Sequence, residues 1–112
     1  MAHVRERFAA YVVDRPDGGP FTRGVREAGL DELPPGELTV AVGWSSVNFK
    51  DGLAAREDGR VARTNPLIPG IDLAGAVVAS DDAGFPVGTK VVALGHDLGG
   101  SRHGGFPAQE RI

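Results

Sequence analysis

An amide, an aromatic ring, an amine and a carboxylate follow one another at Asn48, Phe49, Lys50 and Asp51. Asn is a favoured N-cap residue, and a carboxylate three positions later falls in the first helical turn, where free N–H groups and the helix dipole stabilise it. On residue types alone, Asn48 caps a short helix, Asp51 is the carboxylate of its first turn, and Lys50 is a solvated charge. The same turn could also present these side chains to a small molecule.

Signatures of nucleophilic and phosphate-binding sites are incomplete. Ser45 and Ser46 are not framed by the Gly-x-Ser-x-Gly elbow of a serine hydrolase. The stretch 84–90 has the glycines and lysine of a phosphate loop, but neither its spacing nor a following helix. The sequence contains no Gly-x-Gly-x-x-Gly, the turn at which a Rossmann unit holds a dinucleotide pyrophosphate. We therefore expect no NADPH site within this chain alone.

A metal site is not expected either. The sequence contains no cysteine, which excludes disulfides and thiolate ligands. His96, Asp97 and His103 share one glycine-rich loop, but two histidines and one acid make a poor tetrahedral zinc site. We interpret both histidines as ordinary surface residues.

Asp72 stands out because it follows Gly70 in a strongly apolar segment. A buried carboxylate must be paired or hydrogen-bonded. Arg63 or backbone N–H groups could serve as its partners, which favours a structural role. Gly70 and Gly75 are expected where a strand bends or passes close to another backbone.

The elements that must position these residues are mostly strands. Short apolar runs alternate with turn residues, among them 17 glycines and 8 prolines spread along the chain, a pattern typical of many short strands. We predict strands at 8–14, 21–30, 37–46, 68–80, 90–94 and 106–112, and one short helix at 48–56. The predicted fold is a mostly antiparallel, partly open β-barrel.

Size and charge limit the possible partners. A chain of 112 residues is one domain at most. A formal net charge of −3, without a run of like charges, argues against nucleic acid or an anionic membrane. No apolar run approaches the length of about 18 residues needed for a spanning helix, and no signal peptide is evident. A soluble cytoplasmic protein is therefore the default expectation.

Three segments, taken in order and at their spacing, resemble a known family. They are Trp44-Ser-Ser-Val-Asn-Phe-Lys-Asp51, Ile68-Pro-Gly-Ile-Asp-Leu-Ala-Gly75 and Val87-Gly-Thr-Lys-Val-Val92. Together they resemble the zinc-free medium-chain dehydrogenase/reductases, specifically the acryloyl-CoA reductase and quinone oxidoreductase branch. The resemblance implies the GroES-like fold of that family's catalytic domain. Thr89 departs from the pattern, since it stands where the family's turn has an acid.

The resemblance also implies roles for the turn. Asn48 would be catalytic, lining the cleft where nicotinamide and substrate meet, while Phe49, Lys50 and Asp51 would contact substrate or cofactor. Lys50 would lie near phosphates, a task suited to a flexible point charge. Phe49 replaces the family's usual Tyr, so it cannot donate a proton, and the donor must be another residue or water. Asn48 and Ile71 occupy places where zinc-dependent relatives keep ligands, which implies no zinc.

The implied reaction of the whole enzyme is hydride transfer from NADPH to an enoyl thioester such as acryloyl-CoA, or to a quinone. We expect residues 1–112 to be an incomplete GroES-like N-terminal domain, inactive alone, whose partner is a missing Rossmann domain or subunit. An exposed edge strand at 106–112 could pair two copies into a homo-oligomer. Two alternatives remain: a stand-alone GroES-like interaction module, or a short subunit docking a separate Rossmann partner. The DNA beyond codon 112 would distinguish them.

Overall fold

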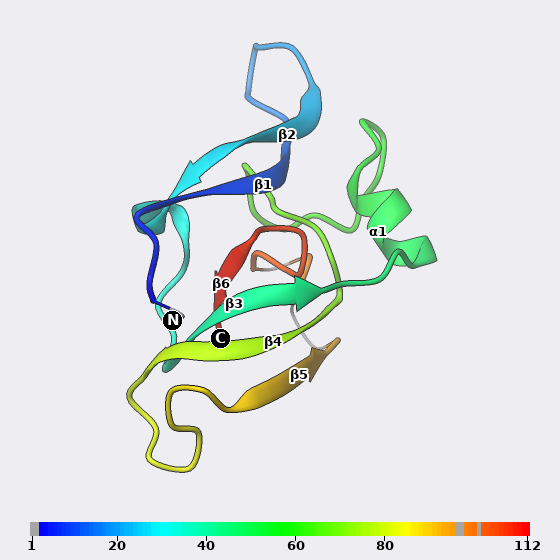
Figure 1. Cartoon of the computed structure of the whole chain (residues 1–112). Helices are drawn as coiled ribbons and strands as arrows, with labels where there is room; N and C mark the ends of the chain where they lie inside the picture. The colour runs from blue at the N-terminus through cyan, green and yellow to red at the C-terminus, as the bar shows by residue number, and fades with distance from the viewer. Residues whose placement is uncertain (1–2, 96–97, 101) are drawn as a thin grey trace.

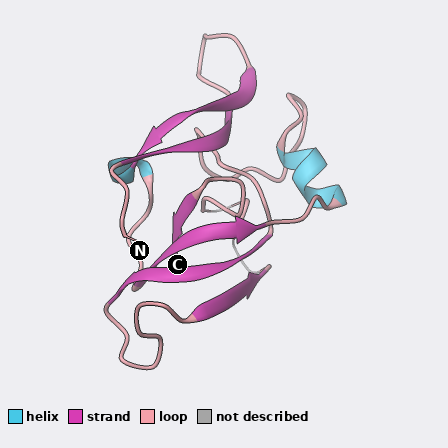
Figure 2. Cartoon of the chain, viewed as in Figure 1, coloured by secondary structure: helices cyan, strands magenta, loops and turns pink. Residues whose placement is uncertain are grey.

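The computed structural model describes residues 3–95, 98–100 and 102–112. These residues form six strands, one α-helix and one 3₁₀ turn (Figures 1 and 2). The strands are β1 (Arg7–Asp14), β2 (Thr22–Gly29), β3 (Leu38–Trp44), β4 (Asp72–Ser80), β5 (Lys90–Leu94) and β6 (Gln109–Arg111). Helix α1 spans Phe49–Ala54, and the 3₁₀ turn spans Leu30–Glu32. The predicted mostly-β fold with one short helix is confirmed.

The strands form two antiparallel sheets. Strands β1 and β2 make a hairpin, and the second sheet has the order β5-β4-β3-β6. Strand β1 also connects to segments outside its hairpin. Val13 and Leu67 exchange two backbone hydrogen bonds of 2.8 Å, and the Tyr11 N–H donates to the Phe106 carbonyl at 3.1 Å. These links join the hairpin to the larger sheet and produce the partly open barrel (Figure 1).

Alternation along β1 separates a core face from a second face. Phe8, Ala10 and Val12 are buried and pack with residues of β2 and of the segment before β4. Because successive side chains of a strand point to opposite faces, Tyr11 lies on the other face and remains half-buried. The same strand therefore contributes to the core and to the cavity described below.

Strand β4 begins at Asp72 rather than at Ile68, so the predicted range 68–80 is too long. Gly70 has a φ of 110°, a left-handed value that breaks the strand. The carbonyls of Ile68, Pro69 and Gly70 accept hydrogen bonds from the N–H groups of residues 104–106 instead. A Cβ at Gly70 would lie 2.6 Å from the Gly105 nitrogen, so only glycine permits this crossing.

The predicted edge strand at 106–112 is confirmed in position, since β6 is the last strand of the larger sheet, but it is not exposed. Strand β6 is short, pairs with β3, and has its residues Gln109 and Glu110 almost fully buried. The Gln109 side chain also exchanges hydrogen bonds with the Arg5 backbone, covering the other side of the strand. Apolar side chains are exposed instead on β5, where Val92 is 66% and Leu94 67% exposed.

Within the described residues, no helix has the length and apolar character needed to cross a bilayer.

Candidate functional site

The turn between β3 and α1 is held by the Asp51 carboxylate. Asn48 is the N-cap residue, as predicted, but its side chain does not bond the free N–H groups of the first turn. Asp51 Oδ2 accepts the Asn48 N–H and Asp51 Oδ1 accepts the Ile71 N–H, both at 2.9 Å. Asp51 is only 2% exposed. The carboxylate thus ties the start of the helix to the segment before β4.

The Asn48 side-chain amide lies between two carboxylates. Its Nδ2 donates to Asp51 Oδ2 at 3.2 Å, to Asp72 Oδ2 at 3.3 Å and to Ser46 Oγ at 3.1 Å. Carboxylates only accept hydrogen bonds, so the amide must turn its NH₂ group toward them. The donor of Asn48 is therefore committed within the protein, and Oδ1 is the atom left for another contact.

Asp72 is bonded by the same turn. Its oxygens accept the Ser46 N–H at 3.1 Å and the Ser46 hydroxyl at 2.7 Å, besides the Asn48 amide. A backbone N–H was one predicted partner, whereas the other predicted partner, Arg63, forms no hydrogen bond to Asp72 among the described residues. Asp72 thus anchors the end of β3 to the beginning of β4.

Phe49 and Lys50, the two residues after Asn48, are exposed to solvent. Phe49 is 85% exposed, Val47 84% and Trp44 78%, and Lys50 is exposed beside them. We call Trp44, Val47 and Phe49 the apolar strip. These three exposed apolar residues fall within one short segment of the chain, and apolar groups that gather on a surface typically mark a binding site.

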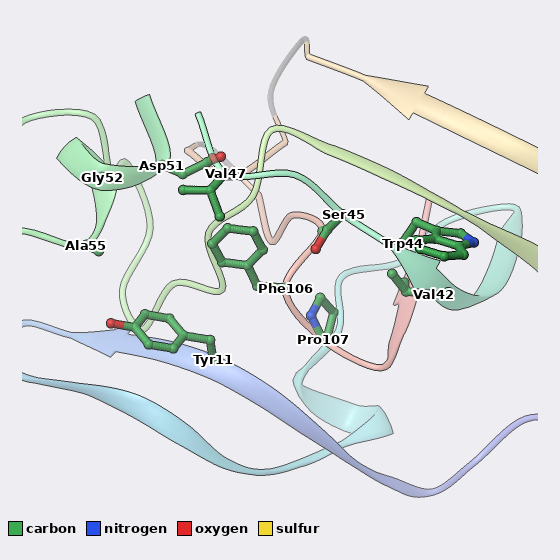
Figure 3. A pocket seen from close by; sticks show the side chains of 12 residues that line it. Tyr11, Val42, Trp44, Ser45, Val47, Asp51, Gly52, Ala55, Phe106 and Pro107 are labelled. Atoms are coloured by element: carbon green, nitrogen blue, oxygen red, sulfur yellow. The ribbon is translucent and has the colours of Figure 1, made fainter. Parts of the chain in front are cut away.

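A cavity of about 460 Å³ opens beside the strip (Figure 3). Its lining comes from β1, the end of β3, α1 with its C-cap, and the loop before β6: Tyr11, Val42, Gly43, Trp44, Ser45, Val47, Asp51, Gly52, Ala55, Gly105, Phe106 and Pro107. The rings of Tyr11 and Phe106 meet edge to face, with centroids 6.3 Å apart. Of the four predicted site residues, only Asp51 lines this cavity. Asn48 is not part of the lining but is hydrogen-bonded to Asp51. Phe49 and Lys50 are not part of the lining either.

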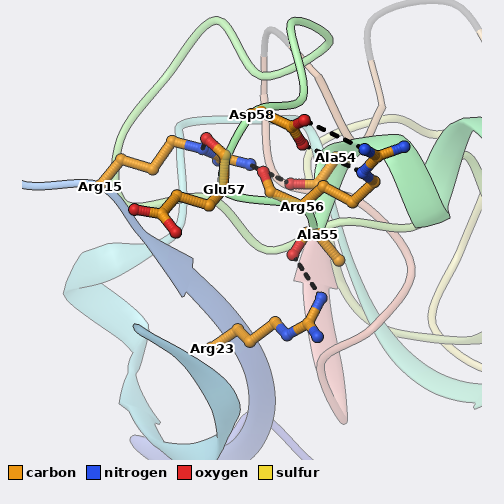
Figure 4. A network of polar contacts seen from close by, with 7 residues as sticks. All are labelled: Arg15, Arg23, Ala54, Ala55, Arg56, Glu57 and Asp58. Carbon is orange, nitrogen blue, oxygen red and sulfur yellow. Dashed lines mark hydrogen bonds and ion pairs between the residues drawn. The ribbon is translucent and has the colours of Figure 1, made fainter. Parts of the chain in front are cut away.

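Two arginines hold the other end of α1 (Figure 4). Arg15 Nη2 donates to the Ala54 carbonyl at 2.8 Å and also bonds the Arg56 carbonyl, and Arg23 Nη1 donates to the Ala55 carbonyl at 2.8 Å. The last carbonyls of a helix have no partners within it, and they attract cations. The hairpin thereby fixes the helix that carries Asp51. No local sequence pattern predicted these contacts, because their partners are 32 to 41 residues apart.

The described residues contain no group of three His, Cys, Asp or Glu side chains placed to hold a metal ion. His96 and Asp97 of the predicted loop lie outside the described residues. His103 is not the surface residue we expected. It is half-buried, its Nδ1 accepts the Ile68 N–H at 3.0 Å, and burial lowers the pKa of its imidazole. This histidine helps to hold the 68–71 segment in place.

The sequence and fold match known oxidoreductases. Residues 34–106 match the alcohol dehydrogenase GroES-like domain. The chain is 41% identical over 106 residues to the acrylyl-CoA reductase AcuI of Ruegeria pomeroyi, covering 94% of this chain and 32% of that protein. It is 43% identical over 82 residues to the putative quinone oxidoreductase YhfP of Bacillus subtilis, covering 73% of this chain and 25% of the relative.

A solved structure shows the same arrangement of strands. The yhdH oxidoreductase from Salmonella enterica, crystallised in complex with NADP, superposes with a TM-score of 0.86 at 38% identity, covering 93% of this chain and 32% of that one. The chain thus spans about a third or less of the length of these relatives. The chain belongs to the medium-chain dehydrogenase/reductase family, and it contains that family's GroES-like domain.

Proposed function

We propose that residues 1–112 form the substrate-side domain of an NADPH-dependent oxidoreductase that reduces an α,β-unsaturated carbonyl, such as an enoyl-CoA, or a quinone. The observation that carries this proposal is the mostly apolar cavity of about 460 Å³ directly beside the apolar strip. Its size suits the acyl part of a small enoyl thioester or a quinone ring. The likeness to an acrylyl-CoA reductase and to a putative quinone oxidoreductase supports the same substrate classes.

The cofactor would be held mainly by a Rossmann domain outside these residues. The Salmonella relative carries NADP and is about three times longer, while this sequence has no glycine-rich dinucleotide turn. That domain would continue the same chain or come from a separate subunit. The apolar strip is the surface it would cover, because burying such side chains is favourable.

Residues of the turn fit the nicotinamide end of that cofactor without a metal. Bound NADPH would supply a hydride for the β-carbon of the substrate. Asn48 Oδ1 can accept a hydrogen bond from an amide N–H, since its Nδ2 is already committed. Phe49 offers an exposed ring for apolar contact, and Lys50 offers a cation for a phosphate. Asp51 fixes the turn that presents all three.

Kinetics of a full-length protein carrying this segment would test the proposal. Wild-type enzyme should oxidise NADPH in the presence of acryloyl-CoA or a benzoquinone, and inactivity toward both would overturn it. Asn48→Ala should lower kcat more than it raises KM, because the lost contact strengthens as charge shifts in the transition state. Asn48→Ser is the control for a purely structural role. If Asn48→Ser turns over normally, Asn48 only shapes the turn.

Two further measurements separate the roles of neighbouring groups. Lys50→Ala should act mainly on KM, since a phosphate contact binds ground state and transition state alike. The isolated 112-residue chain should give no micromolar NADPH binding by calorimetry, because dinucleotide binding needs a helix N-terminus and glycine turn elsewhere. Micromolar binding would show that the cofactor site lies within this chain.

A further inference from the structure

Tyr11 is the only tyrosine of the chain, and it lines the cavity from β1. Its backbone N–H is bonded to the Phe106 carbonyl, and its ring packs edge-on against the Phe106 ring. The first contact fixes the backbone of β1 at Tyr11, and the second orients its ring. Figure 3 shows Tyr11 and Ser45 entering the cavity from different elements, with Phe106 between them in that view. The phenol therefore has a fixed position on the face of β1 that lines the cavity.

The Tyr11 hydroxyl has no hydrogen-bond partner among the described residues, although the side chain is half-buried. The hydroxyl is not one of the enclosed unpaired atoms of the structure, so it is open to a ligand. Asp51, the acid of the lining, accepts hydrogen bonds from Ile71 and Asn48, and a carboxylate has no hydrogen to donate to a carbonyl oxygen. Tyr11 and Ser45 are thus the hydroxyls of the lining, and of the two a phenol is the stronger hydrogen-bond donor.

A proton or hydrogen-bond donor is also what the proposed reaction lacks. Phe49 has no hydroxyl and points into solvent, and the donor of Asn48 is committed to Asp51 and Asp72. A hydride arriving at the β-carbon shifts the C=C electrons toward the carbonyl, so negative charge develops on the carbonyl oxygen. A fixed donor at that oxygen would stabilise the transition state more than the ground state.

We propose that the Tyr11 hydroxyl donates a hydrogen bond to the carbonyl oxygen of the substrate during reduction. This inference rests on the proposed function. The hydride forms the new C–H bond at the β-carbon, the enolate oxygen accepts the Tyr11 hydrogen bond, and the α-carbon then takes a proton from water. Tyr11 keeps its own proton, and the products are the saturated carbonyl compound and the oxidised nicotinamide. The ligand this cavity recognises is a compact apolar group that ends in a carbonyl.

The test is Tyr11→Phe in the full-length enzyme, because this change keeps the ring and its contact with Phe106 and removes only the hydroxyl. We expect kcat with an acryloyl thioester to fall by about 100-fold, the lower end of the loss of an oxyanion donor. KM should change by less than about threefold, and NADPH affinity and melting temperature should be unchanged, since Tyr11 stabilises developing charge rather than the cofactor or the fold. Thr22→Val is the matched control, because it removes an exposed hydroxyl on β2 away from the cavity.

The outcomes separate this inference from the proposed function. If the wild-type enzyme is active and the kcat of Tyr11→Phe lies within twofold of the wild-type value, the role of Tyr11 is overturned and the proposed function stays intact. Wild-type enzyme that reduces neither an enoyl thioester nor a quinone would overturn both. If Tyr11→Phe lowers the melting temperature or the NADPH affinity, the test is repeated with Tyr11→Met. This variant also fills the site and has no hydroxyl. An equal loss of rate and of cofactor binding in both variants would show a structural role and contradict the inference.

Discussion

Two buried carboxylates in this chain differ in how completely they are hydrogen-bonded. Asp51, at the start of α1, is 2% exposed, and both of its oxygens accept hydrogen bonds. Glu110, on β6, is fully buried, with Oε1 bonded to the Arg111 N–H and Oε2 without a partner among the described residues. Burial raises the pKa of Glu110 to about 8, against partial opposition from that N–H and from the charge of Arg102.

The difference follows from where each acid lies. The first turn of a helix has free N–H groups, so an acid there finds donors. The N–H groups of a strand are used in the ladder, so a strand acid finds few. A buried carboxylate is therefore stabilising at Asp51 and costly at Glu110.

The largest predicted effect concerns Glu110 and pH. The folded state binds the Glu110 proton more tightly than the unfolded state, whose pKa is near 4.5. The free energy of unfolding should be unaffected by this group below pH 4.5 and fall as pH rises to about 8. The total loss is on the order of 5 kcal/mol.

Urea unfolding at pH 5 and pH 8.5 measures this loss, with Glu110→Gln as the matched variant. Glu110→Gln should remove most of the pH dependence and be the more stable protein at pH 8.5. An equal fall in stability for both proteins would show that Glu110 is ordinarily ionised in the fold.

Replacing the bonded acid should have the next largest effect. Asp51→Ala would leave the N–H groups of Asn48 and Ile71 without their acceptor, at a cost of about 3 kcal/mol in the free energy of unfolding. Asp51→Asn keeps an acceptor oxygen and should cost about 1 kcal/mol. Urea unfolding at pH 5, where the Glu110 penalty is small, is the measurement. Equal losses for the two variants would mean that a neutral acceptor oxygen at position 51 does not hold the turn and that the carboxylate itself is required.

The arginines at the other end of α1 should contribute less to stability than Asp51, and the more buried of their hydrogen bonds should contribute more than the exposed one. Arg15→Ala should cost about 1 kcal/mol, since Arg15 donates to the Ala54 carbonyl in a partly buried setting and lies 5.3 Å from the Phe21 ring. Arg23→Ala, which loses one exposed hydrogen bond, should cost less than about 0.5 kcal/mol. Amide hydrogen exchange across 51–56 should rise in Arg15→Ala and stay near wild type in Arg23→Ala. The reverse order would mean that Arg23, not Arg15, holds the end of α1.

Local patterns predicted the strands and the helix well. The turn-bounded apolar runs placed β1, β2, β3 and β5 within a residue or two, and the Asn48–Asp51 spacing predicted the start of α1. The failures are long-range. The segment 68–71 leaves the strand because it meets residues 104–106, and no local pattern marks that crossing except Gly70. β6 is short because residues 106–108 bond to β1 instead.

The site was only partly predictable for the same reason. Sequence spacing brought Asn48 and Asp51 together, and the apolar setting of Asp72 required partners for it. The sequence did not indicate that the Asn48 side-chain amide would donate hydrogen bonds to both acids, because that depends on how β4 approaches the turn. Tyr11 could not be assigned to the cavity either, since alternation along β1 gives its face but not what lies opposite.

Trp44 has a consequence that lies outside energetics. It is the only tryptophan of the chain, it is 78% exposed, and it is one of the residues that line the cavity. An indole that moves from water into an apolar contact emits at shorter wavelength. The chain therefore has a built-in optical reporter at its proposed interface, and a blue shift on mixing would follow docking of a Rossmann domain in real time without any label.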